Sequence, residues 1–425
     1  MKRNLLFTLI MTSLILTSCF KDDDTPIIIE EVTNNNYYDN SGGGGDEFET
    51  IVKAGGIAID ETWTSENIYV LDRKVVVQEG VTLTIEPGTI IKGRAGTGSL
   101  SSALIVARGG KIMAEGTPSN PIIFTSEADN IESGETAGTN LDENDRGLWG
   151  GLLVLGYAPC SFSGDVTQVQ IEGIPADDTF GLYGGDDPAD NSGVIQYVSI
   201  RHGGTLIGEG NEINGLTLGG VGTGTTLDNI EVVANVDDGI EFFGGTVNAS
   251  NLLVWAQGDD GLDIDQAFSG TIDNAVVVLG DASDHALEID GPEGTATGSF
   301  TLQNVTLIGN LDTANGEYAD YRSGATGATN NIYAYGFKDV SDVELDNDGV
   351  ATNYNDGLLT FSAWEIVLPT AVTAIEDVFV NKAENITVTG FGSEASAVTQ
   401  GSETVGATTS NLSWTYANEF GGLGF

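Results

Sequence analysis

One acidic phrase occurs three times between residues 237 and 290 of this chain. It reads Asp-Asp-Gly-Ile-Glu-Phe at 237–242, Asp-Asp-Gly-Leu-Asp-Ile at 259–264 and, with substitutions, Asp-His-Ala-Leu-Glu-Ile at 284–289. Carboxylates at this density bind a cation, take up protons or extend into solvent. The chemistry on offer is therefore Ca²⁺ binding or acid–base catalysis, provided that the fold holds the three phrases side by side.

The spacing of the phrases predicts how they are held. Asp260 lies 22 residues after Asp238, and Asp284 lies 24 residues after Asp260. Self-similarity at this period indicates stacked structural repeats, whose equivalent residues form rows. The alternative is that each Asp only forms hydrogen bonds within its own turn. The predicted Ca²⁺ ligands are Asp238, Asp260 and Asp284 in one row and Glu241, Asp263 and Glu288 in a parallel row, with Asp265 and Asp290 extending the stripe.

The elements around the phrases are expected to be short strands. Runs of β-branched residues, such as 68–71, 83–85 and 103–106, alternate with Gly and Pro, and no segment shows sustained helical periodicity. A hairpin sandwich would not repeat its text at this interval, whereas a parallel solenoid would. The sequence therefore predicts an all-β, right-handed parallel β-helix over 51–368, with about a dozen rungs. Residues 369–425 are expected to form a β-rich C-terminal cap, and 127–148 and 172–193 to form projecting loops.

The N-terminus contains a targeting signal. Met1-Lys2-Arg3 precedes an apolar run that ends in Leu16-Thr17-Ser18-Cys19, which resembles a bacterial lipoprotein signal. The resemblance implies a signal peptide over 1–18, acylation of Cys19 and a flexible tether over 19–50. The residues after Cys19, Phe20–Asp24, look like the acidic export signal of Bacteroidota-type surface lipoproteins. We therefore expect an outer-membrane lipoprotein exposed on the cell surface, whose lipid is its only membrane attachment.

The overall charge restricts the class of partner. The formal net charge is −48, so nucleic acids and anionic membrane surfaces are poor partners. Divalent cations, Ca²⁺ above all, are favoured. With Cys19 acylated, Cys160 has no partner cysteine, so no disulfide framework is expected.

Several further segments resemble known β-helix proteins. The segment Leu83–Gly93 resembles the N-terminal coils of secreted bacterial β-helix proteins. With Gly147–Leu152, Ser199–Gly204 and Glu212–Gly220, it is similar to a group of Bacteroidota β-helix lipoproteins over about residues 55–340. That group has no agreed activity, so the resemblance implies fold and location and leaves function open.

A second resemblance concerns the acidic rows. Asn235–Asp237, Asp259-Asp260, His285 and Arg322 are similar in order and spacing to the active site of polygalacturonase-type glycoside hydrolases. The resemblance implies that Asp260 is the general acid, that Asp237 and Asp259 activate water, and that His285 and Arg322 hold the substrate. Two departures weaken it: His285 lacks flanking glycines, and no lysine follows Arg322.

Three functions follow from these patterns. The first is a lipoprotein that binds a glycan or another surface macromolecule through an acidic, Ca²⁺-ordered face. The second is a polysaccharide-degrading enzyme, either a hydrolase or a Ca²⁺-dependent lyase with Arg322 or Arg201 as base. The third is an accessory component of an outer-membrane uptake complex with a membrane-protein partner. Candidate ligand-binding residues are Arg201, His202, Trp149, Trp255 and Tyr183, because Arg and aromatic side chains can bind or stack on sugars.

Overall fold

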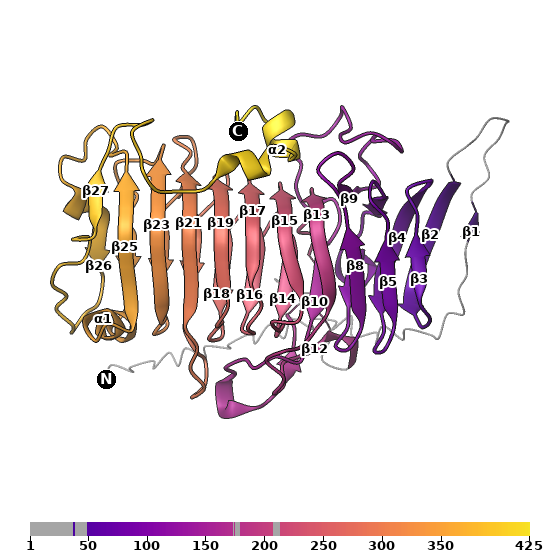
Figure 1. Cartoon of the computed structure of the whole chain (residues 1–425), viewed down its shortest axis with the longest axis horizontal. Coiled ribbons are helices and arrows are strands. Elements are labelled where there is room, and N and C mark those ends of the chain that lie inside the picture. The colour runs from indigo at the N-terminus through magenta and orange to yellow at the C-terminus, as the bar shows by residue number, and fades with distance from the viewer. Residues whose placement is uncertain (1–36, 39–48, 173, 175–178, 207–212) are drawn as a thin grey trace, which may run out of the picture.

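The chain winds into a parallel β-helix, as predicted, with the strands of successive turns side by side along the long axis (Figure 1). The computed structural model describes residues 37–38, 49–172, 174, 179–206 and 213–425. The predicted signal peptide, Cys19 and all but a few residues of the predicted tether lie outside these ranges. None of the helices that the structure describes is long and apolar enough to cross a membrane.

One sheet carries the acidic phrases and is called the acidic sheet. Its strands pair in parallel, each with the strand one turn later. They are β7 (Ala103–Val106), β10 (Leu152–Leu155), β14 (Leu216–Gly219), β16 (Ile240–Phe243), β18 (Leu262–Asp265), β20 (Leu287–Ile289), β22 (Ala319–Tyr321), β24 (Val343–Leu345) and β26 (Phe379–Asn381).

Two further sheets share long strands that bend once. The N-terminal half of β13 (Gly193–Arg201) pairs with β8 (Lys111–Glu115), and its C-terminal half pairs with β9 (Ile122–Ser126), so the two halves belong to different sheets. The later long strands are β15 (Thr226–Val233), β17 (Ala249–Trp255), β19 (Thr271–Val278), β21 (Phe300–Ile308), β23 (Gly327–Tyr335) and β25 (Leu359–Ile366).

The remaining strands lie at the ends of the solenoid or in a loop. The first turns contain β2 (Glu49–Ile57), β3 (Glu61–Trp63), β4 (Asn67–Val77), β5 (Thr82–Ile85) and β6 (Ile90–Gly93), with β1 (Tyr37–Tyr38) antiparallel to β2. β11 (Val169–Gln170) and β12 (Leu182–Tyr183) form a hairpin in a loop that projects from the solenoid (Figure 1), and β27 (Ala395–Ala397) pairs with β25.

Stacked asparagines make the bend in the long strands. Asn229, Asn251, Asn274, Asn304 and Asn331 all have φ between 55° and 64°. Asparagine tolerates this left-handed region better than most residues, and its amide can bond to the next turn. Asn274 Nδ2 donates to Asn251 Oδ1 at 2.7 Å, and Asn331 Nδ2 donates to Asn304 Oδ1 at 3.0 Å. The corner is therefore supported from turn to turn.

The interior is a continuous apolar column. In the acidic sheet, Phe242, Ile264, Ile289, Tyr321 and Leu345 follow one another in register and are each 0–1% exposed. Because side chains alternate across a strand, the residues before and after each of them point outward. The core thus determines which side chains reach the outer face.

The C-terminal end is closed by aromatic side chains. Phe361, Trp364, Phe379, Phe391 and Tyr354 pack with ring centroids 5.2–6.1 Å apart. Tyr354 comes from α1 (Asp348–Asn355), which lies at this end of the molecule (Figure 1). Within the expected β-rich cap of 369–425, only β26 and β27 are strands, and they complete the last turn.

Residues 398–425, called the C-terminal strap, run back along the outside of the solenoid (Figure 1). The strap ends in α2 (Tyr416–Glu419) and a short tail. Leu412 and Ala417 pack on outward-facing Leu253 and Val276. Its hydrogen bonds join Thr404 to Glu365, Ala407 to Thr306, Thr408 to Asn274, Asn411 to Asn251, and Ala417 to Glu231. The expected cap is therefore a last turn followed by a strap.

The first of the two expected loops, 127–148, does not project freely. Lys92 Nζ donates to the carbonyls of Asp129 and Ile131, both at 2.8 Å. Arg146 donates to the carbonyl of Ala256 at 2.8 Å. These bonds hold both ends of the segment against the solenoid.

Candidate functional site

The outer face of the acidic sheet carries a row of carboxylates. Glu241 pairs in register with Asp263, and Asp263 with Glu288, as the repeat predicts. The row continues through Asp320 of β22 and Glu344 of β24. Adjacent strands lie about 4.8 Å apart, so these side chains are forced close together.

A second row differs from the prediction by one residue. Asp238 and Asp260 lie one above the other, since Gly239 N donates to the carbonyl of Asp260. The next place belongs to His285, whose carbonyl accepts from Gly261 N, and not to Asp284. The reason is a longer turn before β20, in which Gly280 N donates to Ser283 Oγ at 2.9 Å. The extra residue shifts Asp284 to the corner, beside the exposed Asp259.

Asp238, Glu241 and Asp263, called the first acidic cluster, place carboxylate oxygens within 4.8 Å of one another. Each is 6–8% exposed. Burial, and after it the neighbouring carboxylates, raise the pKa of all three well above the usual range. The Asn214 amide donates to Glu241, but Asn214 Oδ1 and Asp263 Oδ1 are buried without a hydrogen-bond partner among the described residues.

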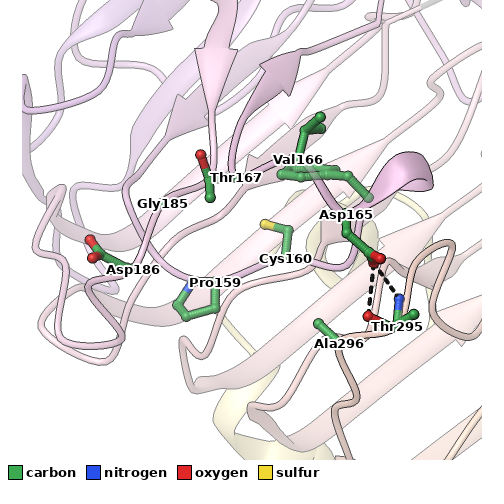
Figure 2. Close-up of a pocket in the computed structure, with 10 residues that line it drawn as sticks. Pro159, Cys160, Asp165, Val166, Thr167, Gly185, Asp186, Thr295 and Ala296 are labelled. Atoms are coloured by element: carbon green, nitrogen blue, oxygen red, sulfur yellow. Dashed lines mark hydrogen bonds between the residues drawn. The ribbon is translucent and has the colours of Figure 1, made fainter.

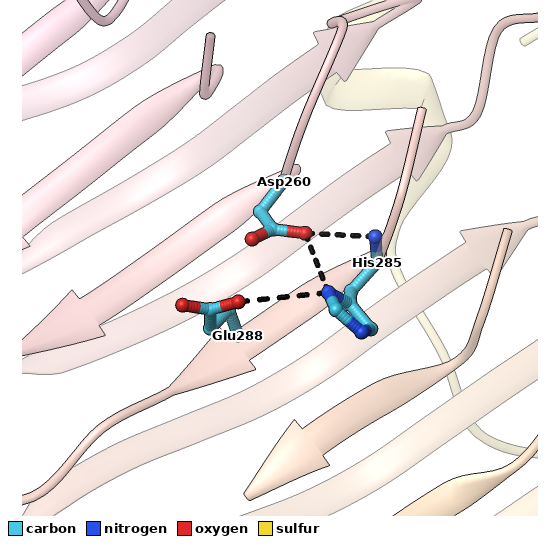
Figure 3. Close-up of side chains that lie close together, drawn as sticks. All are labelled: Asp260, His285 and Glu288. Carbon is cyan, nitrogen blue, oxygen red and sulfur yellow. Dashed lines mark hydrogen bonds and ion pairs between the residues drawn. The ribbon is translucent and has the colours of Figure 1, made fainter. Parts of the chain in front are cut away.

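His285 lies between Asp260 and Glu288 (Figure 3). Asp260 Oδ1 accepts from the backbone N–H of His285 at 2.7 Å and from its Nδ1 at 2.8 Å, and Glu288 Oε2 is 3.6 Å from Nδ1. Burial disfavours the imidazolium, but the hydrogen bond and charge of Asp260 outweigh it and raise the pKa of His285 to about 9. His285 is therefore a cation at neutral pH.

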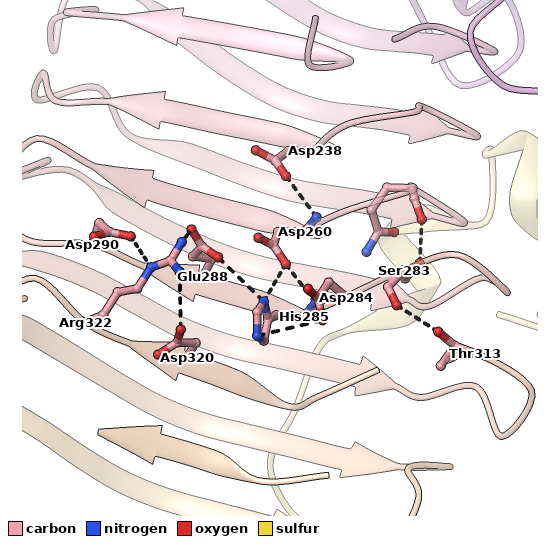
Figure 4. A network of polar contacts seen from close by, with 11 residues as sticks. Asp238, Asp260, Ser283, Asp284, His285, Glu288, Asp290, Thr313, Asp320 and Arg322 are labelled. Atoms are coloured by element: carbon pink, nitrogen blue, oxygen red, sulfur yellow. Dashed lines mark hydrogen bonds and ion pairs between the residues drawn. The ribbon is translucent and has the colours of Figure 1, made fainter. Parts of the chain in front are cut away.

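Arg322 is the centre of an adjoining group, called the Arg322 cluster, with Glu288, Asp290 and Asp320 (Figure 4). Its Nε lies 2.7 Å from Asp290 Oδ2, a terminal nitrogen lies 3.6 Å from Asp320 Oδ2, and a third ion pair joins it to Glu288. Burial raises the pKa of Asp320 to about 6, although the charge of His285 opposes this. An arginine with three carboxylate partners stays protonated and cannot serve as a base.

The last group on this face, called the Lys382 cluster, contains Glu317, Asp342, Glu344 and Lys382. The three acids place ligand atoms within 4.8 Å of one another. Lys382 Nζ is 3.7 Å from Asp342 Oδ2 and also pairs with Glu344. Burial and the charge of Asp342 raise the pKa of Glu317 to about 7.

The residues that resemble a polygalacturonase site are close in space but differently engaged. The nearest oxygens of Asp237, Asp238 and Asp259 lie within 4.8 Å of one another. An inverting hydrolase needs its two carboxyl groups about 6.5–9.5 Å apart. Asp260, the expected general acid, is 4% exposed and bonded to His285. Burial and the charge of Asp260 raise the pKa of the exposed Asp259 to about 6.

The five expected ligand-binding residues do not form an open surface. Trp149 is 0% exposed and donates from Nε1 to the carbonyl of Arg201 at 2.7 Å. Arg201 and His202 are 2% and 1% exposed, and Arg201 lies over the ring of Tyr416 in the strap. Tyr183 is buried and donates to Gln266, while Trp255 is half-buried against Tyr416. The core and the strap cover all five.

Sequence analysis did not identify Asp320, Glu344 or Lys382. A signal was present for the first two. Ala-Asp-Tyr-Arg at 319–322 and Val-Glu-Leu-Asp at 343–346 keep the alternation of apolar and charged residues seen at 262–265. Both segments lack the preceding Asp-Asp-Gly, which hid the repeat. Lys382 follows the last short strand, and no motif marked it.

Comparison with known proteins agrees with this architecture. A family model described as a pectate-lyase-like β-helix domain matches residues 55–418. No curated protein and no solved structure matches the chain. The matched region extends from the first turns into the strap and so covers the acidic sheet and its clusters. The chain therefore belongs to the pectate-lyase-like β-helix domain family.

Proposed function

We propose that this protein is a cell-surface lipoprotein that binds a polysaccharide or another surface macromolecule through the outer face of its acidic sheet, with Ca²⁺ bound at the first acidic cluster. One observation carries the proposal. Among the described residues, no lysine, arginine or histidine forms an ion pair with Asp238, Glu241 or Asp263. The Arg322 and Lys382 clusters both contain a basic residue of their own.

The donor set fits Ca²⁺. This ion takes six to eight oxygen ligands and is found with carboxylates, amide carbonyls and water. Asp238, Glu241 and Asp263 supply carboxylates, and the unpaired Asn214 Oδ1 belongs to a side chain already bonded to Glu241. When bound, the ion would supply the positive charge that this cluster lacks and a coordination point for ligand oxygens.

Binding is favoured over catalysis by the state of the expected catalytic residues. Asp260 is bonded to His285, and Arg322 is held by three carboxylates. Arg201, the other expected lyase base, is buried under Tyr416. Each would have to leave its partners before it could reach a substrate.

A polysaccharide-degrading enzyme is the second candidate, and Asp259 is the observation in its favour. Its side chain is exposed and its pKa is raised to about 6. A carboxyl group that titrates close to neutral pH suits general acid–base catalysis.

The location is part of the same proposal. Acylation at Cys19 would attach the β-helix to the outer membrane through the 19–50 tether, with the acidic sheet available to external ligands. A membrane-protein partner in an uptake complex is compatible with this attachment, as an accessory role.

The test combines binding and product release. Purified protein is offered neutral and uronate polysaccharides with Ca²⁺ or with a chelator, beside Asp263→Asn and the control Glu115→Gln, an exposed acid outside the acidic sheet. We expect Ca²⁺-dependent binding that Asp263→Asn weakens and Glu115→Gln leaves intact, without products. Products that disappear in Asp259→Asn would identify an enzyme instead. Absence of binding in every condition would overturn the proposal.

A further inference from the structure

A cavity of about 380 Å³ opens beside the acidic sheet, where strands β16 and β18 end (Figure 2). Three segments line it, 159–167, 185–186 and 295–296. Its volume lies in the lower part of the range typical of small-ligand sites, about 300–1,000 Å³. The lining residues are Pro159, Cys160, Phe162, Asp165, Val166, Thr167, Gly185, Asp186, Thr295 and Ala296.

The walls of this cavity are bonded to the solenoid. Gly245 N donates to the carbonyl of Pro159 at 2.9 Å, and Ser161 N donates to the carbonyl of Gln266 at 2.9 Å. From the third segment, Gly294 N donates to Ser161 Oγ at 3.1 Å. A site held in this way loses little conformational entropy when a ligand enters, which favours binding.

The lining is apolar at its base and acidic at its rim. Phe162 is 2% exposed and packs edge-on against Tyr183, whereas Val166 is 49% exposed. Burial raises the pKa of Cys160 to about 12, so its thiol is uncharged and acts as a small apolar group.

Two carboxylates and two threonine hydroxyls supply the polar groups. Asp165 Oδ1 accepts from the backbone N–H of Thr295 at 2.7 Å and from its hydroxyl at 2.9 Å. These bonds lower the pKa of Asp165 and keep it ionised. No basic residue is among the described residues that line the cavity. An ionised carboxylate only accepts hydrogen bonds, so the rim selects donors such as sugar hydroxyls and repels anions.

We propose that this cavity binds one uncharged sugar residue of the glycan, with its hydroxyls on Asp165 and Asp186 and its carbon face on Phe162 and Val166. The inference rests on the proposed function and adds the class of ligand: a neutral residue, and not a uronate, occupies this position.

The cavity is continuous with the acidic sheet. Cys160 Sγ donates to the carbonyl of Phe243 at 3.4 Å, and Cys160 packs on Gly244. Glu241 of the first acidic cluster precedes Gly244 by three residues, a distance of about 10 Å along a strand. A glycan with one residue in the cavity therefore reaches the cluster with its next residues.

The experiment is calorimetric titration of the whole protein in Ca²⁺ with neutral and uronate oligosaccharides of equal length. Ala296→Phe places a ring in the cavity, and Ala189→Phe, at an exposed position of the same loop, is the matched control. We expect neutral oligosaccharides to bind more tightly than uronates, and Ala296→Phe to weaken them about tenfold or more. The control should leave their affinity unchanged.

The outcomes separate the two proposals. Equal affinity of Ala296→Phe and wild type for neutral oligosaccharides would overturn the cavity assignment and leave the proposed function standing. Tighter binding of uronates would overturn the charge argument. Failure of every glycan to bind wild type would remove the proposed function and this inference together. Should Ala296→Phe not fold, Asp186→Asn at the exposed rim decides, because it must still weaken neutral oligosaccharides.

Discussion

The first acidic cluster and the Arg322 cluster present the same problem on neighbouring strands and solve it differently. Asp263 and Glu288 are register partners and are both 8% exposed. Glu288 has a guanidinium from the chain itself, whereas Asp263 keeps one oxygen unpaired. The solenoid determines how closely carboxylates stack, but each turn has its own source of neutralising charge. The cluster without such a source is the one that depends on protons or on an external ion.

The largest expected effect comes from removing the internal cation. Arg322→Gln leaves Glu288, Asp290 and Asp320 together without their main counter-charge. Removal of one partner from a buried ion pair typically costs about 3–5 kcal/mol, and we expect a loss near the lower figure, about 3 kcal/mol, because Arg322 is 34% exposed. The free energy of unfolding from urea titration, without Ca²⁺, measures this loss.

The matched control is Arg94→Gln. Arg94 pairs with Asp72 and Glu127, and all three side chains are 37–48% exposed. Exposed pairs contribute about 0–1 kcal/mol. Equal losses in the two variants would show that the Arg322 cluster is not special.

The second prediction concerns Ca²⁺ and pH. The pKa values of Asp238, Glu241 and Asp263 are raised in the folded state, so without metal their contribution to stability falls as pH rises above the unfolded values near 4. Ca²⁺ replaces the protons, so its stabilising effect should be greater at pH 8 than at pH 5.

At a Ca²⁺ concentration of 100 times Kd, the expected gain is about 2.7 kcal/mol. Thermal unfolding with Ca²⁺ or a chelator measures it, and Asp263→Asn should abolish most of the gain. A metal effect that does not change between pH 5 and pH 8 would contradict the assignment of these carboxylates.

The third prediction uses the two histidines of the chain. NMR titration should show one imidazole, His285, with a pKa of about 9, and the other, His202, below its ordinary value because burial disfavours its charge. The stability that His285 contributes is complete below about pH 6.5 and is lost as pH rises through 9. Asp260→Asn should lower the pKa of His285, and a pKa unchanged by that substitution would show that Asp260 is not its source.

The smallest effect is expected at Lys382, which is 42% exposed. Lys382→Gln should cost about 1 kcal/mol or less of unfolding free energy. It should also leave Glu317, Asp342 and Glu344 without a basic partner among the described residues. If missing internal charge creates a Ca²⁺ site, this variant gains a second Ca²⁺-dependent rise in Tm, which wild type lacks. No gain would mean that the first acidic cluster needs more than an absent cation.

The repeat in the sequence was sufficient to predict the fold and the row of Glu241, Asp263 and Glu288, because both follow from strand period and stacking. It placed Asp284 wrongly, since a turn with one extra residue changes the register and no local pattern records that. The burial of Trp149 was also beyond it. Whether an aromatic residue near a loop points inward depends on neighbours such as Phe124, which come from distant turns.

The strap was equally beyond local patterns. Residues 398–425 contain no repeat, and their partners lie far away in the sequence: Thr408 N bonds to Asn274 and Ala417 N to Glu231, over separations of 134 and 186 residues. Only the assembled solenoid brings these groups together.

In an array of stacked turns, each turn contacts only its neighbours, so such arrays can fray from an open end. The C-terminal strap adds bonds between turns that are not neighbours, from Glu365 of β25 to Glu231 of β15. The terminal turns cannot peel away until the strap has left the earlier ones. The strap therefore makes unfolding of this half of the rod a more cooperative event, and it gives a protein tethered at its N-terminus resistance to proteases that attack frayed ends.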